Sequence, residues 1–266
     1  GDGMASSQAT LAEYYNQFEN LEDPNHSYEE HGESFIDMTK EEHSDRLMMH
    51  RLDHEGSTRT AGSYTLVPGS AQTATSLATG FKTDRDTIAL DLNDKPLESV
   101  LMAAQDKGMA TGLVSTARIT HATPASFGSN VPDRGMENEI AAQYLENEID
   151  YLVGGGARHF LPGSNENSKR EDDRNLFEEF ANNGYQVFES SNDTAAFRDY
   201  EPQAGDQVLY TPTMSHVSYE IDRNDKLVPS IAEMTQKGIE LLKQDNDGFF
   251  MMIEGGRIDH AAHDND

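Results

Sequence analysis

Cysteine is absent from the 266 residues of this chain, and basic side chains are scarce. Without cysteine the chain forms no disulfide bond, no thiol nucleophile and no thiolate metal site. Its 20 lysines and arginines face 48 aspartates and glutamates, so the formal net charge at pH 7 is −28. So acidic a chain repels nucleic acid and anionic lipid, and we expect neither as a dedicated partner. The charge is compatible with a halophilic source, where salt screens self-repulsion, or with simple solubility.

Long apolar runs are missing as well. No stretch of the sequence reaches the ~20 apolar residues that a membrane-spanning helix needs, and no signal peptide is recognisable. A secreted mature protein would look the same, so these two absences leave the compartment open.

Helical and strand-like patterns alternate along most of the chain. Short apolar runs that predict strands cover residues 109–115, 149–153, 185–189 and 249–253. Segments with apolar residues at helical spacing cover residues 96–107, 137–147, 176–181 and 229–243. This alternation predicts an α/β fold with a mostly parallel central sheet and helices on both faces. We expect a single domain over residues 1–266, in which residues 7–18 form a helix and about 19–60 a polar, acidic excursion with scattered histidines.

Ser70 begins a run of small residues directly after Pro68 and Gly69. Because a short apolar run at 64–67 precedes it, we place Ser70 at a strand-to-helix turn. The unpaired N–H groups of a helix start attract anions, phosphate above all, so Ser70 is a candidate nucleophile. Serine is also a common helix cap, and this stretch alone leaves both interpretations open.

Polar side chains follow the last predicted strand, where an α/β sheet gathers its ligands. Glu254 ends a very apolar run, which is an unfavourable place for a carboxylate without a partner or a metal ion. Asp259 and His263 are four residues apart, on one face of a helix. Their oxygen and nitrogen donors suit zinc or a similar ion, although an ordinary Asp–His pair would look the same. Asp2, between two glycines, is either a turn residue or a further ligand.

Five motifs, taken together, resemble the alkaline phosphatase family. They are Gly1-Asp2-Gly3-Met4, the turn at Ser70, Val114-Ser115-Thr116-Ala117 with His121-Ala122-Thr123-Pro124-Ala125, Gly154-Gly155-Gly156, and Glu254-Gly255-Gly256-Arg257-Ile258-Asp259-His260-Ala261-Ala262-His263. Most are weak signals individually, but they occur in the family's order, at closely similar spacings, across the whole chain. The resemblance implies the three-layer alkaline phosphatase fold, incomplete here at both ends.

The resemblance also implies a reaction, the hydrolysis of small phosphate monoesters with two zinc ions and one magnesium ion. Ser70 would accept the phosphoryl group, and one zinc ion would coordinate its oxygen and lower its pKa. Arg134 matches the arginine that clamps the phosphate, because a planar guanidinium can hold two phosphate oxygens. Considered alone, Arg134 could equally form a surface ion pair.

The remaining metal ligands are carried over in the same way. Asp2, Thr123 and Glu254 would hold the magnesium ion through oxygen atoms, as magnesium prefers. Asp2 would also bridge to a second ion. Asp259 and His263 would supply part of the other zinc site, which would stabilise the leaving oxygen and activate water.

Two histidines and one glycine indicate which type of alkaline phosphatase the chain resembles. His121 would lie beside the magnesium site, and His260 would reach the phosphate through water, as in animal and some marine bacterial enzymes. Gly69 stands where the family usually has an acid that tethers the clamping arginine, so we expect Arg134 to be freer here. The family's other zinc ligands would follow residue 266, so we expect residues 1–266 alone to be a poor catalyst.

Homodimerisation and a periplasmic or secreted location are implied by the resemblance alone. One alternative is a related metal-dependent phosphodiesterase, mutase or sulfatase. The other is an acidic metal-binding fragment without catalytic competence.

Overall fold

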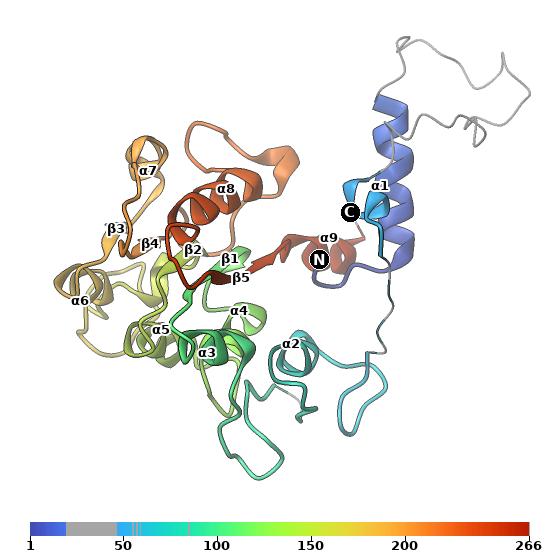
Figure 1. Ribbon diagram of the computed structural model, residues 1–266, viewed down its shortest axis with the longest axis horizontal. Helices are drawn as coiled ribbons and strands as arrows, with labels where there is room; N and C mark the ends of the chain where they lie inside the picture. Colours follow the sequence, from blue (N-terminus) through green and yellow to red (C-terminus); the bar gives the residue numbers. More distant parts are fainter. Residues whose placement is uncertain (20–46, 55, 57, 59, 85, 266) are drawn as a thin grey trace, which may run out of the picture. The chain divides into compact units, whose positions relative to one another are not determined.

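The computed structural model describes residues 1–19, 47–54, 56, 58, 60–84 and 86–265 (Figure 1). They form two compact units, Gly3–Arg59 and the larger Gly1–Asp2 with Thr60–Asp266. The smaller unit contains the predicted first helix, α1 (Ser6–Glu19), and the 3-10 turn η2 (Met48–Arg51). Most of the acidic excursion, with His26, His31 and His43, lies outside the described residues, and the single domain stays a prediction. Within the described residues, no helix is both long and apolar enough to cross a bilayer.

The larger unit is built on a sheet of five parallel strands in the order β3-β4-β2-β1-β5. The strands are β1 (Ala110–Arg118), β2 (Tyr151–Gly155), β3 (Gln186–Phe188), β4 (Val208–Tyr210) and β5 (Phe249–Glu254). Parallel strands are buried on both faces and therefore have nearly continuous apolar sequences, which is why four of the five were predictable. The predicted α/β class is confirmed.

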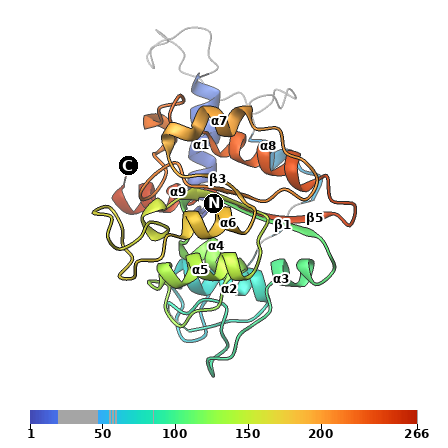
Figure 2. The same ribbon diagram turned by 90° about the vertical axis from the view of Figure 1, so that its left-hand side faces the viewer.

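Helices cover both faces of this sheet, so the unit has three layers (Figure 2). One core joins α2–α6 to Leu113 and Leu152, and the other joins α7 and α8 to Val114 and Val153. The helices are α2 (Ser70–Thr79), α3 (Val100–Gln105), α4 (Ala122–Gly128), α5 (Glu137–Glu146), α6 (Leu176–Asn182), α7 (Thr194–Asp199), α8 (Ile231–Leu242) and α9 (Arg257–Asp264). Three 3-10 turns connect them: η3 (Ala157–His159), η4 (Ser191–Asp193) and η5 (Glu220–Asp222).

The start of α2 differs from the prediction in two respects. No strand precedes it, because Leu66 and Val67 are 89% and 87% exposed and do not pair with a neighbouring strand. Gly69, not Ser70, is the N-cap, and its N–H donates to Gln72 Oε1 at 3.0 Å. The capping interpretation of Ser70 is therefore wrong, and its hydroxyl is available for another partner.

Candidate active site

Ser70 and Asp2, 68 residues apart in sequence, meet at the start of α2. The Ser70 hydroxyl donates to Asp2 Oδ2 at 2.8 Å. Asp2 is turned toward it by a tight N-terminal turn in which Gly3 has a φ of 60°. A glycine adopts this left-handed conformation without steric cost. The structure thus gives the predicted nucleophile a carboxylate partner.

Glu254 lies at the carboxyl end of β5, opposite Ser115 of β1, and is 2% exposed. Its Oε2 accepts a hydrogen bond from Ser115 Oγ at 2.5 Å, whereas Oε1 is buried and has no hydrogen-bond partner among the described residues. Burial raises the pKa of the Glu254 carboxyl, the hydroxyls of Ser115 and Thr123 oppose the shift, and the charge of Asp2 adds to it. A bound cation would satisfy the open oxygen and offset the repulsion between the two carboxylates.

The predicted metal ligands come together as pairs. Asp2 lies close enough to Glu254 for its charge to help raise the pKa of the Glu254 carboxyl. On α9, His263 Nε2 lies 3.6 Å from Asp259 Oδ1, with the two side chains 79% and 23% exposed. No group of three or more His, Cys, Asp or Glu side chains suited to a metal ion occurs in the described part of the chain. Each pair thus brings together two side chains with the donor atoms that were predicted, oxygen in the first pair and oxygen with nitrogen in the second.

Three histidines gather near the carboxyl ends of the central strands. The ring centroids of His216 and His260 are 4.3 Å apart, and those of His121 lie 5.5 and 5.8 Å from them. His121 and His260 were predicted site residues. His216 was missed, since it follows β4, which was not among the predicted strands. Recognition of β4 would have placed His216 where ligands gather.

Each ring of this cluster faces an arginine. Nη1 of Arg118 lies 2.5 Å from His216 Nε2, Nη2 of Arg134 lies 2.9 Å from His121 Nε2, and Nη1 of Arg257 lies 2.9 Å from His260 Nδ1. Because a guanidinium can only donate, Nε2 of His121 and Nδ1 of His260 are proton-free acceptors. His216 faces a donor of Arg118 at each ring nitrogen and, as a neutral ring, accepts at one of them.

The electrostatics of the three rings agree with this assignment. Burial, reinforced by nearby arginine charges, lowers the pKa of His121 to about 2 and that of His216 to about 3. Burial also lowers the pKa of His260, as does the charge of Arg257. The rings are therefore neutral at pH 7, and the arginines supply the positive charge.

The glycine triplet at the end of β2 explains how His216 reaches the cluster. A Cβ on Gly155 would lie 2.0 Å from the carbonyl oxygen of Ser215, and Gly156 has a φ of 105°. The Gly156 N–H also donates to the Thr213 carbonyl at 2.9 Å. Because glycines carry no Cβ, the backbone of segment 213–217 can pass this close to the end of β2.

We expect Gly155→Ala to lower the free energy of unfolding by about 2–3 kcal/mol, because the new methyl group overpacks against a backbone carbonyl. Urea denaturation followed by circular dichroism measures the change. Gly135→Ala is the control, since its Cβ would meet only the side chain of Asp133 at 3.0 Å, and should change stability by no more than about 0.5 kcal/mol. Equal effects of both substitutions would contradict the close approach at Gly155.

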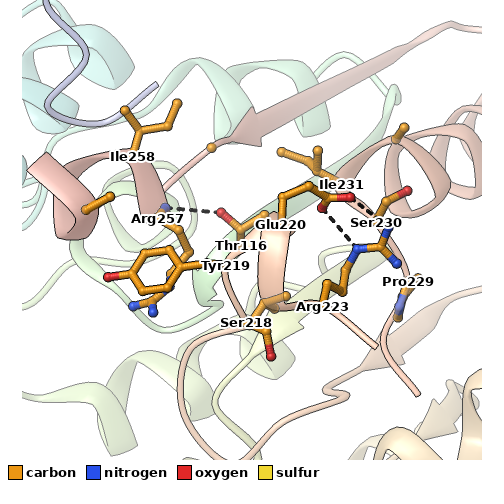
Figure 3. Close-up of a pocket in the computed structure, with 14 residues that line it drawn as sticks. Thr116, Ser218, Tyr219, Glu220, Arg223, Pro229, Ser230, Ile231, Arg257 and Ile258 are labelled. Carbon is orange, nitrogen blue, oxygen red and sulfur yellow. Dashed lines mark hydrogen bonds and ion pairs between the residues drawn. The ribbon is translucent and has the colours of Figure 1, made fainter. Parts of the chain in front are cut away.

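A pocket of about 530 Å³ lies beside the site, between η5 and the start of α9 (Figure 3). Arg257 stacks over the Tyr219 ring at 3.7 Å, and its backbone N–H donates to Thr116 Oγ1 at 3.2 Å. None of the predicted site residues lines this pocket.

One known family matches the sequence of this chain along its whole length. The sequence profile of alkaline phosphatase matches residues 1–266. The chain belongs to the alkaline phosphatase family.

Relatives in this family agree in sequence and fold. Alkaline phosphatase 3 of Bacillus subtilis is 41% identical over 206 residues, which cover 75% of this chain and 41% of the relative. A cold-active alkaline phosphatase from a psychrophilic Shewanella has a TM-score of 0.78 at 29% identity, over 100% of this chain and 57% of that one. The chain thus spans about two fifths of the length of its Bacillus relative.

A third alkaline phosphatase bears on the metal content of the family. The structure of a histidine-to-aspartate variant of the enzyme from the Antarctic bacterium TAB5 has Mg bound in its M3 site. That protein has a TM-score of 0.66 at 28% identity, over 78% of this chain and 56% of its own.

Proposed function

We propose that the protein hydrolyses phosphate monoesters and that Ser70 is the nucleophile. The observation that carries this proposal is the position of the Ser70 hydroxyl, on the first residue of α2 and bonded to Asp2 at 2.8 Å. A Cβ on the preceding Gly69 would lie 3.9 Å from Arg134 Nη1, so the arginine is beside the same helix start. An anion at this place would meet free N–H groups, a helix dipole and a guanidinium.

The reaction follows from these positions. The Ser70 hydroxyl gives up its proton to solvent as its oxygen attacks phosphorus, the bond to the alcohol breaks, and the leaving oxygen takes up a proton from solvent. Water then cleaves the phosphoserine and releases inorganic phosphate. Arg134 orients two phosphate oxygens through parallel N–H bonds, and Asp2 orients the Ser70 hydroxyl before attack by accepting its hydrogen bond. Two zinc ions and one magnesium ion, when bound, would supply charge stabilisation and activated oxygen nucleophiles.

For the magnesium ion we propose Asp2, Thr123 and Glu254 as ligands. The buried, unpartnered Oε1 of Glu254 supports this assignment, and all three residues offer oxygen, as magnesium prefers. We propose that His121, two residues before Thr123, lies beside this site as a neutral ring.

For zinc we propose Asp259 and His263 as part of one site and Ser70 at the other. The 3.6 Å approach of Asp259 to His263 on α9 supports a shared ion. We propose that His260 reaches the phosphate through water, and the contact that orients its ring, from Arg257 Nη1 to Nδ1, supports this role.

Trapping the phosphoserine tests this function. The complete protein that carries this chain, loaded with zinc and magnesium, is incubated with a phosphomonoester at low pH, quenched in acid and digested. Mass spectrometry should find one phosphate on Ser70, and a chelator should abolish both the label and the turnover. Turnover without a label on Ser70 would refute the assignment, and hydrolysis of a sulfate ester alone would favour the sulfatase alternative.

A homodimer and a periplasmic or secreted location complete the proposal. Membership of the family supports both, and sedimentation of the complete protein would measure the first.

A further inference from the structure

The phosphate-clamping arginine of the proposed function lacks the acid that usually tethers it. Gly69 occupies that position, next to Ser70. An arginine side chain loses considerable rotamer freedom when it is fixed. A clamp that is not held beforehand would therefore lose part of its affinity for phosphate.

The structure shows where Arg134 is held instead. Its backbone N–H donates to the Asp86 carbonyl at 2.7 Å, which fixes the base of the residue. At the tip, Nη2 lies 2.9 Å from His121 Nε2. Nη1 remains on the side of Gly69 and the helix start, 3.9 Å from where a Cβ at position 69 would lie.

His121 is itself a firmly placed acceptor. It is the N-cap residue of α4, and its backbone N–H and C=O bond to Arg118 and Ala125 at 2.9 and 3.0 Å. The edge of its ring packs against His216, which contacts Arg118. Glu137 in turn holds Arg118 through two bonds of 2.7 Å. The ring that receives Arg134 is thus connected to a buried ion pair.

We propose that His121 anchors Arg134 in place of the acid that is absent at position 69. Replacing a carboxylate anchor by an imidazole changes how much of the arginine's positive charge is available to phosphate. A carboxylate tether competes with phosphate for the guanidinium, whereas a neutral imidazole accepts one hydrogen bond and leaves the positive charge available. Arg134 is thereby oriented for phosphate without being neutralised.

A double-mutant cycle tests this role, which rests on the proposed function. The substitutions are His121→Phe, which keeps an aromatic ring but removes the acceptor, and Gly69→Asp, which restores an acidic tether. Position 69 accepts a side chain, because its φ is −87° and the nearest atom to a Cβ is Arg134 Nη1 itself. The readouts are inorganic phosphate affinity by calorimetry and kcat/KM, both on the complete, metal-loaded protein.

We expect His121→Phe to weaken phosphate binding roughly 10-fold when position 69 is glycine, the size of effect typical of a hydrogen bond to a charged group. In the Gly69→Asp background the same substitution should cost about 2-fold or less, because the carboxylate then holds the arginine. Gly69→Ala is the control, since it adds a side chain without an acceptor, and it should leave the loss close to 10-fold. His121→Gln, which retains an acceptor, should bind phosphate within about 3-fold of the original protein.

An equal loss in both backgrounds would overturn the anchoring role, since His121 would then act elsewhere, such as at the metal site. Failure of His121→Gln to restore binding would overturn it as well. If the unsubstituted protein neither binds nor releases phosphate, the proposed function itself fails, which is a distinct result.

Discussion

Replacement of Ser70 by alanine is expected to lower kcat/KM of the complete protein for a phosphomonoester by roughly 10⁴-fold or more. Alanine offers no oxygen to phosphorus, so the covalent route is lost and only direct attack by water remains. Because Ser70 is the first residue of α2 and not its N-cap, the helix loses no capping bond. Phosphate binding should therefore fall far less than turnover, since Arg134 and the helix start remain.

Ser76→Ala is the matched control for this experiment. Ser76 lies on the same helix, and its hydroxyl bonds to the Gln72 carbonyl at 2.9 Å, away from Asp2. It should keep kcat/KM within about 2-fold, as is usual for substitutions outside a reacting centre. Equal turnover in Ser70→Ala and the original protein would remove Ser70 from the mechanism.

Glu137→Ala is expected to lower the free energy of unfolding by about 3–5 kcal/mol, because it leaves a buried arginine without its counter-ion. Glu137 pairs with Arg118 through both carboxylate oxygens, and the two side chains are 10% and 14% exposed. The same carboxylate accepts a hydrogen bond from Thr120 at 2.7 Å and lies 3.3 Å from His159 Nε2. Urea denaturation at pH 7 measures the loss.

The control is a second bidentate pair with the same chemistry on the surface. Arg174 and Glu179 are joined at 3.0 and 2.7 Å, with side chains 42% and 34% exposed. Glu179→Ala should cost no more than about 1 kcal/mol, because solvent screens exposed ion pairs. Similar losses in the two variants would show that burial does not set the strength of the Glu137 pair.

The sequence predicted the elements that bury the longest apolar runs. β1, β2 and β5 were recognisable because parallel strands are apolar throughout. β4 (Val208–Tyr210) is as short as β3 but was not predicted, because no predicted helix precedes it, whereas β3 follows the helix predicted at 176–181. With β4 unseen, the segment that follows it had no assigned place in the sheet, and His216 was missed.

Individual site residues were easier to anticipate than their contacts. Asp2, Ser70 and Glu254 were selected by chemistry and order, and the structure brings Asp2 to Ser70 across 68 residues. The expectation that Arg134 would be freer rested on the missing acid at position 69 alone. The contact with His121 joins the N-cap of α4 to a residue that lies beyond the other end of the helix, and no local pattern reports it.

The pairing of arginines with neutral rings has a consequence for how the substrate arrives. With a net charge of −28, the chain as a whole repels an approaching phosphate ester over long distances. Arg134 and Arg257, each bonded to an imidazole at 2.9 Å, create an attraction that acts only at close range. Added salt reduces the long-range barrier more than the local attraction, because screening grows with distance. We therefore expect ionic strength to favour the diffusional capture of the proposed phosphate ester, the reverse of the usual behaviour of an electrostatically steered enzyme.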